Sequence, residues 1–307
     1  MNKILYVLTH PNRLLAAIWA RIGGAIPDAT YLQVRFRLIF GRKLHLDNPQ
    51  TFNEKLNWLK IYNRRPEYVS FVDKYEVKQI VSEKLKKTQG RLIPTYGVWD
   101  TFDEIDFDKL PDQFVLKSTN GGGGTGIVIC RNKSTFDRIT AKKQLEASMH
   151  ICWKTQREWV YRDIKPRIIA EELMQNDDGS QLVDWKLFCF DGEPLLLFYA
   201  SDRYTKGEPL KFDWYDMDLR HLPIQSKGYP NANKKLEMFP EWEDMKQVAR
   251  NLSAGIPHVR ADLYLVNHKI YFGEMTFFHD GGFVPIYPEV WDYTIGKWLV
   301  LPDPYKE

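Results

Sequence analysis

The stretch FVLKSTNGGGGTGIVIC, residues 114–130, places a lysine and five glycines between two apolar runs. Lys117 ends the first run, and glycine occupies five of the six positions from 121 to 126. A β-hairpin needs only one or two glycines. A loop without side chains also lets backbone N–H groups approach anionic oxygens, and a neighbouring lysine can reach the same phosphates. The stretch therefore predicts a hairpin that covers the phosphates of a nucleotide, and an ordinary flexible hairpin is the alternative.

The order of residues around the glycines excludes two common phosphate loops. In a P-loop the lysine follows the glycines, whereas here it precedes them. In a dinucleotide-binding fold the glycines open a helix, whereas here the run GIVICR follows and predicts a strand. A hairpin lid over a nucleotide, of the kinase or grasp type, remains.

The composition is that of an ordinary globular protein. The chain has 307 residues, 27% of them charged, and a net charge of +3. Because the charges are nearly balanced, we expect no nucleic-acid partner. The three cysteines, at 130, 152 and 189, match no metal-binding spacing and favour a reducing cytoplasm.

The apolar residues near the N-terminus are interrupted by polar and charged ones. The sequence has no uninterrupted apolar span of about 20 residues, so we expect no transmembrane helix. The segment RLLAAIWARI, residues 13–22, can form a helix with one apolar face. We expect this helix to pack on its own domain, and peripheral contact with a membrane surface is the alternative. The predicted location is the cytoplasm, with the inner face of the membrane left open.

The first part of the chain has mainly helical patterns, and the rest mixes helical and strand patterns. Residues 1–70 are mostly helical in pattern, and Thr51, with Glu54 three positions later, has the form of a capping box. Beyond this region strands and helices mix, and Asp191-Gly192 and Asn267-His268 are hairpin-turn signals. This mixture predicts an α+β fold of hairpin-built sheets with packed helices.

Two acidic residues lie in the segment RADLYLVNHKIYFGEMTF. Asp262 and Glu274 fall on the two arms of a predicted hairpin, and adjacent antiparallel strands can bring such carboxylates to one face. Facing carboxylates repel unless a cation lies between them, and Mg²⁺ is commonly held by one or two carboxylates plus phosphates. The pair therefore predicts a magnesium site, and two solvent-facing acids are the alternative.

A third group of polar residues surrounds the segment IIAEELMQNDDGSQLVDWK. Glu171 and Glu172 follow an apolar strand, where a carboxylate and backbone amides can contact an adenine edge. Asp184 is a candidate for a ribose hydroxyl, and Lys186 and Arg203 are further cations on the next two strands. A surface hairpin with ordinary charges is the alternative.

Taken in order, these segments resemble the ATP-grasp superfamily over residues 74–282, through VDKYEVKQIV, FVLK, NGGGG, IIAEEL, DWK and ADLY…FGEMTF. The resemblance implies two α+β subdomains that grip ATP, after a helical region at 1–70. The first, 71–170, carries the glycine loop, and the second, 171–307, carries the hinge and the metal-binding strands.

The same resemblance implies ATP and Mg²⁺ as cofactors and assigns the site residues. The ATP-binding residues that it implies are Lys74, Lys117, Gly121, Gly122, Gly123, Gly124, Glu171, Glu172, Leu173, Asp184 and Lys186. The metal ligands that it implies are Asp262, Glu274 and Thr276, the last standing where the superfamily commonly has asparagine. The catalytic cations that it implies are Lys186 and Arg203, and Arg203 corresponds to an arginine facing the γ-phosphate. Arg260 is our own candidate for a catalytic cation that stabilises an oxyanion.

A closer resemblance, from about residue 30 onward, is to the TupA-like branch, which is found in polysaccharide biosynthesis. It is carried by NPQTFNEKLNWLKIYNRRPEYVSFVDKYEVK, PRIIAEELM, DWKLFCFDGEP and VRADLY…KIYFGEMTF. It implies a ligase that joins an amine or amino acid to the uronic-acid carboxyl of a bacterial surface polysaccharide, although many members are labelled glycosyltransferases.

Two other classes of function stay open at this point. One is an ATP-dependent sugar phosphotransferase, for which His258 or His279 would have to supply the general base. The other is a non-catalytic or glycosyltransferase-associated sugar-binding protein. The sequence gives no indication of the oligomeric state.

Overall fold

The computed structural model describes residues 15–16, 18–19, 23–122, 126–150, 153–201, 209–226 and 228–306. The predicted site residues Gly123, Gly124 and Arg203, and much of the predicted helix at 13–22, lie outside them. Within the described residues, no helix is long and apolar enough to cross a membrane.

Helices predominate in the first part of the described chain. The α-helices between residues 28 and 85 are α3 (Asp28–Phe40), α4 (Phe52–Tyr62), α5 (Tyr68–Val72) and α6 (Glu76–Leu85). The predicted capping box opens α4: the Thr51 hydroxyl accepts from the Glu54 N–H, and the Glu54 carboxylate accepts from the Thr51 N–H. Gly41 ends α3 with a φ of 73°, a left-handed conformation that favours glycine.

Seven strands form the larger sheet, in the order β1-β12-β11-β6-β7-β8-β9. Their bounds are β1 Gly90–Leu92, β6 Asp184–Phe190, β7 Glu193–Ser201, β8 Lys211–Tyr215, β9 His221–Leu222, β11 His258–Val266 and β12 Lys269–Thr276. The β1–β12 pair is parallel, and the other pairs are antiparallel. Both predicted hairpin turns are confirmed, because Asp191-Gly192 joins β6 to β7, Asn267-His268 joins β11 to β12, and all four residues have positive φ.

Four strands form a smaller antiparallel sheet, in the order β2-β5-β3-β4. Their bounds are β2 Thr95–Trp99, β3 Phe114–Ser118, β4 Ile127–Cys130 and β5 Ile168–Glu171. β3 and β4 are the two arms of the hairpin predicted around the glycines, with Lys117 opposite Ile127. This sheet and α7 (Arg138–Met149), residues 95–171, are called the lid below.

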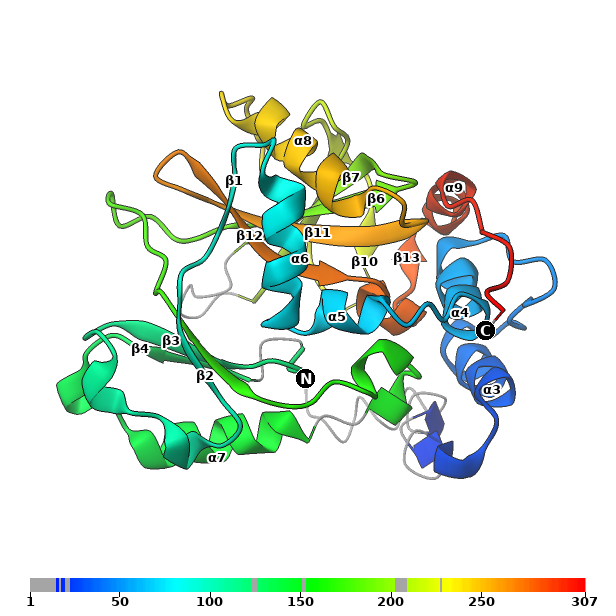
Figure 1. Cartoon of the computed structure of the whole chain (residues 1–307). Coiled ribbons are helices and arrows are strands. Elements are labelled where there is room, and N and C mark those ends of the chain that lie inside the picture. The colour runs from blue at the N-terminus through cyan, green and yellow to red at the C-terminus, as the bar shows by residue number, and fades with distance from the viewer. Residues whose placement is uncertain are drawn as a thin grey trace.

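Two separate hydrophobic cores support this arrangement. The larger core joins the N-terminal helices to the seven-stranded sheet, and the smaller core lies between the lid strands and α7. In Figure 1 the lid lies below the larger sheet, and α3 and α4 lie at one end with α9 (Val290–Trp298). The subdomain boundaries predicted near residues 70 and 170 stay predictions.

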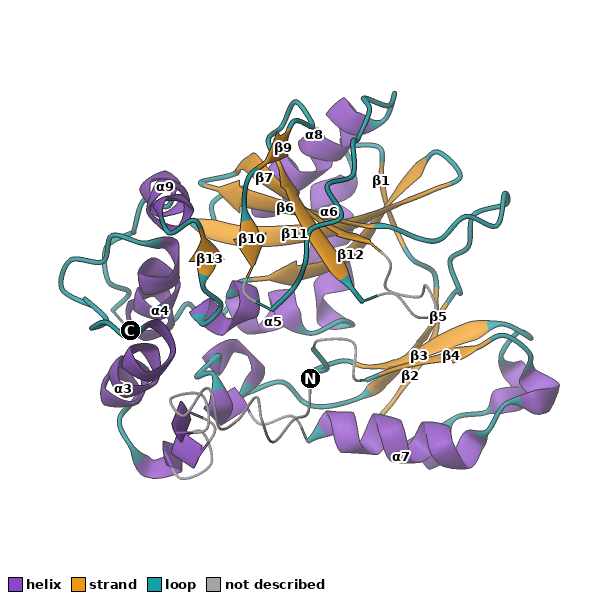
Figure 2. Ribbon diagram, turned by 180° about the vertical axis from the view of Figure 1, so that it is seen from behind, coloured by secondary structure: helices purple, strands orange, loops and turns teal. Residues whose placement is uncertain are grey.

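The helix α8 (Trp242–Ser253) covers one face of the larger sheet. Its buried residues recur every three or four positions, so they form one stripe that packs on β6, β7 and β11. Figure 2 shows these strands from the side away from α6 and α8. Because side chains alternate along a strand, Val259, Ala261 and Leu263 share one face of β11, and Arg260 and Asp262 share the other.

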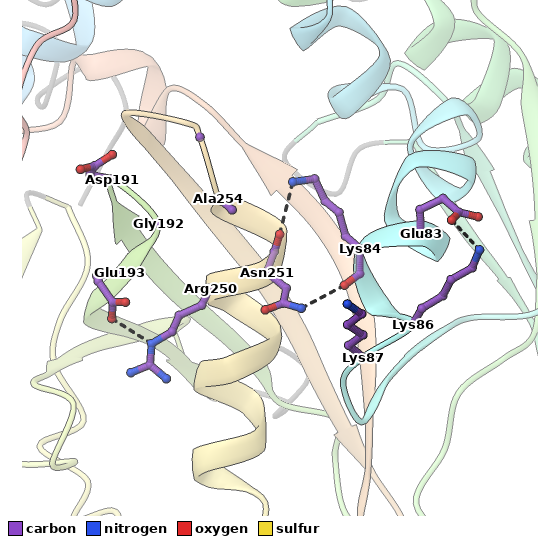
Figure 3. Close-up of a pocket in the computed structure, with 11 residues that line it drawn as sticks. Glu83, Lys84, Lys86, Lys87, Asp191, Gly192, Glu193, Arg250, Asn251 and Ala254 are labelled. Carbon is purple, nitrogen blue, oxygen red and sulfur yellow. Dashed lines mark hydrogen bonds and ion pairs between the residues drawn. The ribbon is translucent and has the colours of Figure 1, made fainter.

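The C-terminal turns of α6 and α8 meet beside the β6–β7 turn, at a pocket of about 770 Å³ (Figure 3). There the Lys84 ammonium donates to the Asn251 carbonyl, and the Asn251 amide donates to the Lys84 carbonyl, both at 3.2 Å. Arg250 and Glu193 form an ion pair at 2.9 Å at the same pocket. The two hydrogen bonds between Lys84 and Asn251 fasten α6 to α8. They thereby fix the position of α6, whose first turn adjoins the lid.

The remaining elements are short. β10 (Gln225–Ser226) and β13 (Ile286–Tyr287) form a two-stranded sheet. The 3₁₀ helices are η1 Gly23–Ala25, η2 Phe102–Glu104, η3 Phe107–Lys109, η4 Lys133–Thr135, η5 Trp153–Thr155, η6 Trp159–Tyr161 and η7 His279–Gly282.

Candidate active site

Three neighbouring strands bring Lys186, Asp262 and Glu274 side by side. Asp262 on β11 is paired with Glu274 on β12 and with Lys186 on β6. Residues directly opposite each other in antiparallel strands point to the same face. The predicted juxtaposition of Asp262 and Glu274 is therefore confirmed, and a lysine lies next to them.

Asp262 is held by two cations of the protein itself. Its side chain is 2% exposed, and its oxygens accept from Arg260 Nε and Nη2, both at 2.7 Å, and from Lys186 Nζ at 2.5 Å. Burial alone would raise the pKa of Asp262, but the Arg260 and Lys186 charges outweigh burial and lower it. Asp262 is thus an ionised carboxylate at neutral pH.

Glu274 has a different environment from Asp262. Its side chain is 41% exposed, and it lies 3.8 Å from Lys74 Nζ and 3.8 Å from Arg260 Nη2. These distances exceed hydrogen-bond length, so the carboxylate keeps oxygens available for another partner.

The predicted metal ligands form a set of oxygen donors. Asp262 and Glu274 offer carboxylates, and Thr276 offers a hydroxyl that accepts from Arg260 Nη2 at 3.1 Å. Oxygen is the donor type that Mg²⁺ prefers. No group of three or more His, Cys, Asp or Glu side chains gathers within the part of the chain that the structure describes. The set fits a cation that completes its coordination with phosphate oxygens and water.

The two histidines considered as general bases have other roles. His258 is buried, its Nδ1 lies 2.9 Å from the Cys189 carbonyl, and burial lowers its pKa to about 3. His279 Nδ1 lies 3.0 Å from Arg260 Nη1 and so serves as an acceptor, while burial lowers the pKa of His279 to about 4. Both imidazoles are neutral near pH 7, and neither offers a free base to a sugar hydroxyl.

On the lid, Lys117 and Glu171 face each other across β3 and β5. Lys117 Nζ donates to Glu171 Oε2 at 2.6 Å, and Lys78 Nζ from α6 donates to Glu171 Oε1. Lysine ammonium groups engage both oxygens of the buried Glu171 carboxylate, and its predicted contact with an adenine edge stays a prediction. This carboxylate therefore neutralises and orients lysines.

Lys74 connects the lid to the larger sheet. Its ammonium donates to the carbonyl of Gly121, and it lies 3.8 Å from Glu274. Its backbone N–H donates to the Thr119 carbonyl at 3.1 Å. A Cβ at position 121 would lie 2.3 Å from Ser118 Oγ, so a larger residue there would force the Ser118 side chain to move. Lys74 thus lies between Gly121, where the glycine run begins, and the carboxylate of Glu274.

A family model described as TupA-like ATPgrasp matches residues 54–300, about four fifths of the chain. The chain belongs to the TupA-like ATP-grasp family. Membership confirms the predicted family and the expected α+β ATP-grasp fold. A comparison with curated proteins finds no match.

Solved structures of ATP-grasp ligases resemble the chain at low identity. An L-amino acid ligase from Bacillus licheniformis is 12% identical, with 84% of this chain and 57% of that chain covered and a TM-score of 0.46. A D-alanine–D-alanine ligase from Bacillus anthracis, complexed with ATP, is 13% identical, with 67% and 53% covered and a TM-score of 0.39. The ligase from Helicobacter pylori is 12% identical, with 73% and 61% covered and a TM-score of 0.41. The chain thus spans less than two thirds of the length of these three structures.

Among the residues assigned by resemblance to ATP-grasp proteins, the structure gathers Lys74, Lys117 and Glu171 at the lid. It gathers Lys186, Asp262, Glu274 and Thr276 on the larger sheet, and Asp184 lies 3.4 Å from Lys186. Arg260, our own candidate, lies beside them. Glu172 is exposed and its N–H donates to the Pro94 carbonyl at 3.0 Å, while Leu173 is partly buried and directly follows Glu172. Their predicted contacts with adenine stay predictions.

Sequence reasoning missed Lys78. It lies in the first turn of α6, four residues after Lys74, which precedes the helix. Its partner Glu171 lies far along the chain, on β5.

Proposed function

We propose that this TupA-like ATP-grasp protein is an ATP- and Mg²⁺-dependent carboxylate–amine ligase that acts through an acyl phosphate. The observation that carries the proposal is the alignment of Lys186, Asp262 and Glu274 on three adjacent strands, linked through Lys74 to the lid. Cations and carboxylates lie side by side there, as binding of a polyphosphate together with a metal ion requires.

In the first step of the proposed reaction, a carboxylate oxygen of the acceptor attacks the γ-phosphorus of ATP and ADP leaves. We assign Lys117 and Lys74 to the phosphates, because their ammonium groups lie at the lid and beside the glycine loop. Asp262 and Glu274 are the residues that would hold Mg²⁺, which when bound would neutralise charge on the phosphoryl group. Lys186 supplies a further positive charge from β6.

In the second step the amine nitrogen attacks the acyl carbon, phosphate leaves, and the nitrogen loses a proton. Arg260 is the cation that we assign to the oxyanion of this step. Its Nε and Nη2 donate to Asp262, and its guanidinium is thereby fixed in one orientation. Closure of the lid would exclude water that otherwise hydrolyses the acyl phosphate.

The proposed acceptor is a uronic-acid carboxyl of a surface polysaccharide, with an amino acid or amine as the nucleophile. Support for it comes from the resemblance to the TupA-like branch. A sugar phosphotransferase is less well supported, because His258 lies in the hydrophobic core and His279 Nδ1 is engaged by Arg260.

The product distinguishes the two reactions. Wild-type protein with ATP, Mg²⁺, a uronic-acid oligosaccharide and hydroxylamine should release ADP and form a hydroxamate, because hydroxylamine traps an acyl phosphate. Omission of the carboxylate should stop ADP release, and Lys117→Ala should abolish both signals. A stable sugar phosphate without hydroxamate would overturn the ligase proposal and favour the phosphotransferase.

A further inference from the structure

Lys78 is fully engaged by protein groups. Its ammonium donates to the Ile93 carbonyl at 2.6 Å, to Thr95 Oγ1 at 2.7 Å and to Glu171 Oε1. An ammonium has three donors, so all of them have protein partners. Lys78 therefore cannot bind a ligand without leaving one of these groups.

The three partners of Lys78 lie where the chain passes from one sheet to the other. Ile93 lies in the connection between β1 of the larger sheet and β2 of the lid, Thr95 begins β2, and Glu171 ends β5 of the lid. Lys78 itself projects from α6, which is fastened to α8 at its far end. The ammonium is thus held at a fixed position next to the Glu171 carboxylate.

Glu171 divides its charge between two lysines. One oxygen accepts from Lys78 and the other from Lys117. The exposed fraction of the side chain is 14% for Lys78, 17% for Lys117 and 6% for Glu171. Among the described residues, Glu171 is the hydrogen-bond partner of the Lys117 ammonium. The trio carries one net positive charge, and Lys117 keeps donors for another anion.

We propose that Lys78 is a positioning residue for nucleotide binding, which shares the charge of Glu171 so that Lys117 stays available to phosphate oxygens. The inference rests on the proposed function, in which Lys117 contacts the phosphates of ATP. Without Lys78, both oxygens of a buried carboxylate would compete for Lys117 alone. The local charge would fall from +1 to zero, and the attraction for an anion would weaken.

The test is the dissociation constant of ATP with Mg²⁺, measured by isothermal titration calorimetry. Lys78→Met should weaken binding by about tenfold, because a neighbouring charge is lost from a partly buried site. Lys78→Arg should restore most of the affinity. Lys84→Met is the matched control: this lysine lies on the same helix and donates to the protein, but at the far end, so affinity should not change.

The double variant Lys78→Met/Glu171→Gln separates charge sharing from a purely structural role. It removes one charge of each sign and leaves Lys117 positive, so it should bind ATP more tightly than Lys78→Met. A purely structural role predicts that the double variant binds no better than the single one. Thermal unfolding of each variant shows whether it is folded, and Lys78→Gln, alone and with Glu171→Gln, makes the same comparison if Lys78→Met does not fold.

The outcomes distinguish this inference from the function on which it rests. Wild-type binding with unchanged affinity in Lys78→Met overturns the inference alone. A double variant that is no better than Lys78→Met also overturns it. If the wild-type protein does not bind ATP, the proposed function and this inference fall together.

Discussion

Replacement of Asp262 by asparagine should lower the stability of the protein as well as its affinity for metal. Asp262 accepts two hydrogen bonds from Arg260 and one from Lys186 while its side chain is 2% exposed. Asparagine keeps one acceptor oxygen, but it removes the negative charge and turns an amide NH₂ toward one of the cations. Arg260 and Lys186, which are both largely buried, would then have no carboxylate at position 262 to neutralise them.

The expected magnitude follows from the burial of the ion pair. Removal of one partner from a buried, hydrogen-bonded pair typically costs about 3–5 kcal/mol, because the remaining charge stays without compensation. Glu274→Gln is the matched control, since Glu274 is 41% exposed and its two cations lie at 3.8 Å. An exposed pair of this kind contributes about 0–1 kcal/mol. Asp262→Asn should therefore be the far more destabilising of the two.

Urea denaturation, followed by the fluorescence of the ten tryptophans, measures both unfolding free energies. In the proposed function both variants also lose the Mg²⁺ dependence of ATP binding. Only Glu274→Gln should lose this dependence without a large loss of stability. Equal stability of Asp262→Asn and wild type would refute the reasoning, because the Arg260 and Lys186 contacts would then contribute nothing. A large loss in Glu274→Gln would refute the assignment of Glu274 as a weakly paired carboxylate.

Other predictions concern stability. Thr51→Ala should lower the unfolding free energy by about 1 kcal/mol, because it removes the hydroxyl of the capping box, and urea denaturation measures the change. Gly296→Ala should lower the melting temperature, since a Cβ there would lie 2.3 Å from the Gln50 carbonyl oxygen; an unchanged melting temperature would contradict that contact. Burial raises the pKa of Asp292 to about 6, so the folded state holds this proton more tightly than the unfolded state, and its contribution to stability falls as pH rises from about 4 to about 6. Asp292→Asn should therefore flatten the dependence of the unfolding free energy on pH in that range.

Local patterns in the sequence account for much of the fold. The capping box at Thr51, the turns at Asp191-Gly192 and Asn267-His268, and the hairpin around the glycines depend on residues close together in the chain. The pairing of Asp262 with Glu274 follows from the same information, because a short turn fixes the register of a hairpin.

The parts that the sequence did not reveal depend on contacts between distant segments. The place of His258 is determined by Phe52 of α4, whose ring lies 5.0 Å away, and by Phe190 on the neighbouring strand. Lys78 was missed because its helix pattern says nothing about β5, where Glu171 lies. The contact of Arg260 with Asp262 could have been anticipated, since residues two apart on a strand share a face.

The charges of the site explain why phosphate and metal binding should be coupled. The oxygens of Asp262 already accept from Arg260 and Lys186, so a cation that binds there has to share the carboxylate with them. Phosphate oxygens are acceptors that could take hydrogen bonds from Arg260 or Lys186 in place of Asp262. Glu274, in contrast, is ready to bind a cation without losing a hydrogen bond to the protein. In the proposed function this arrangement favours the nucleotide and the metal binding together, because phosphate oxygens would release Asp262 from the cations that it now neutralises.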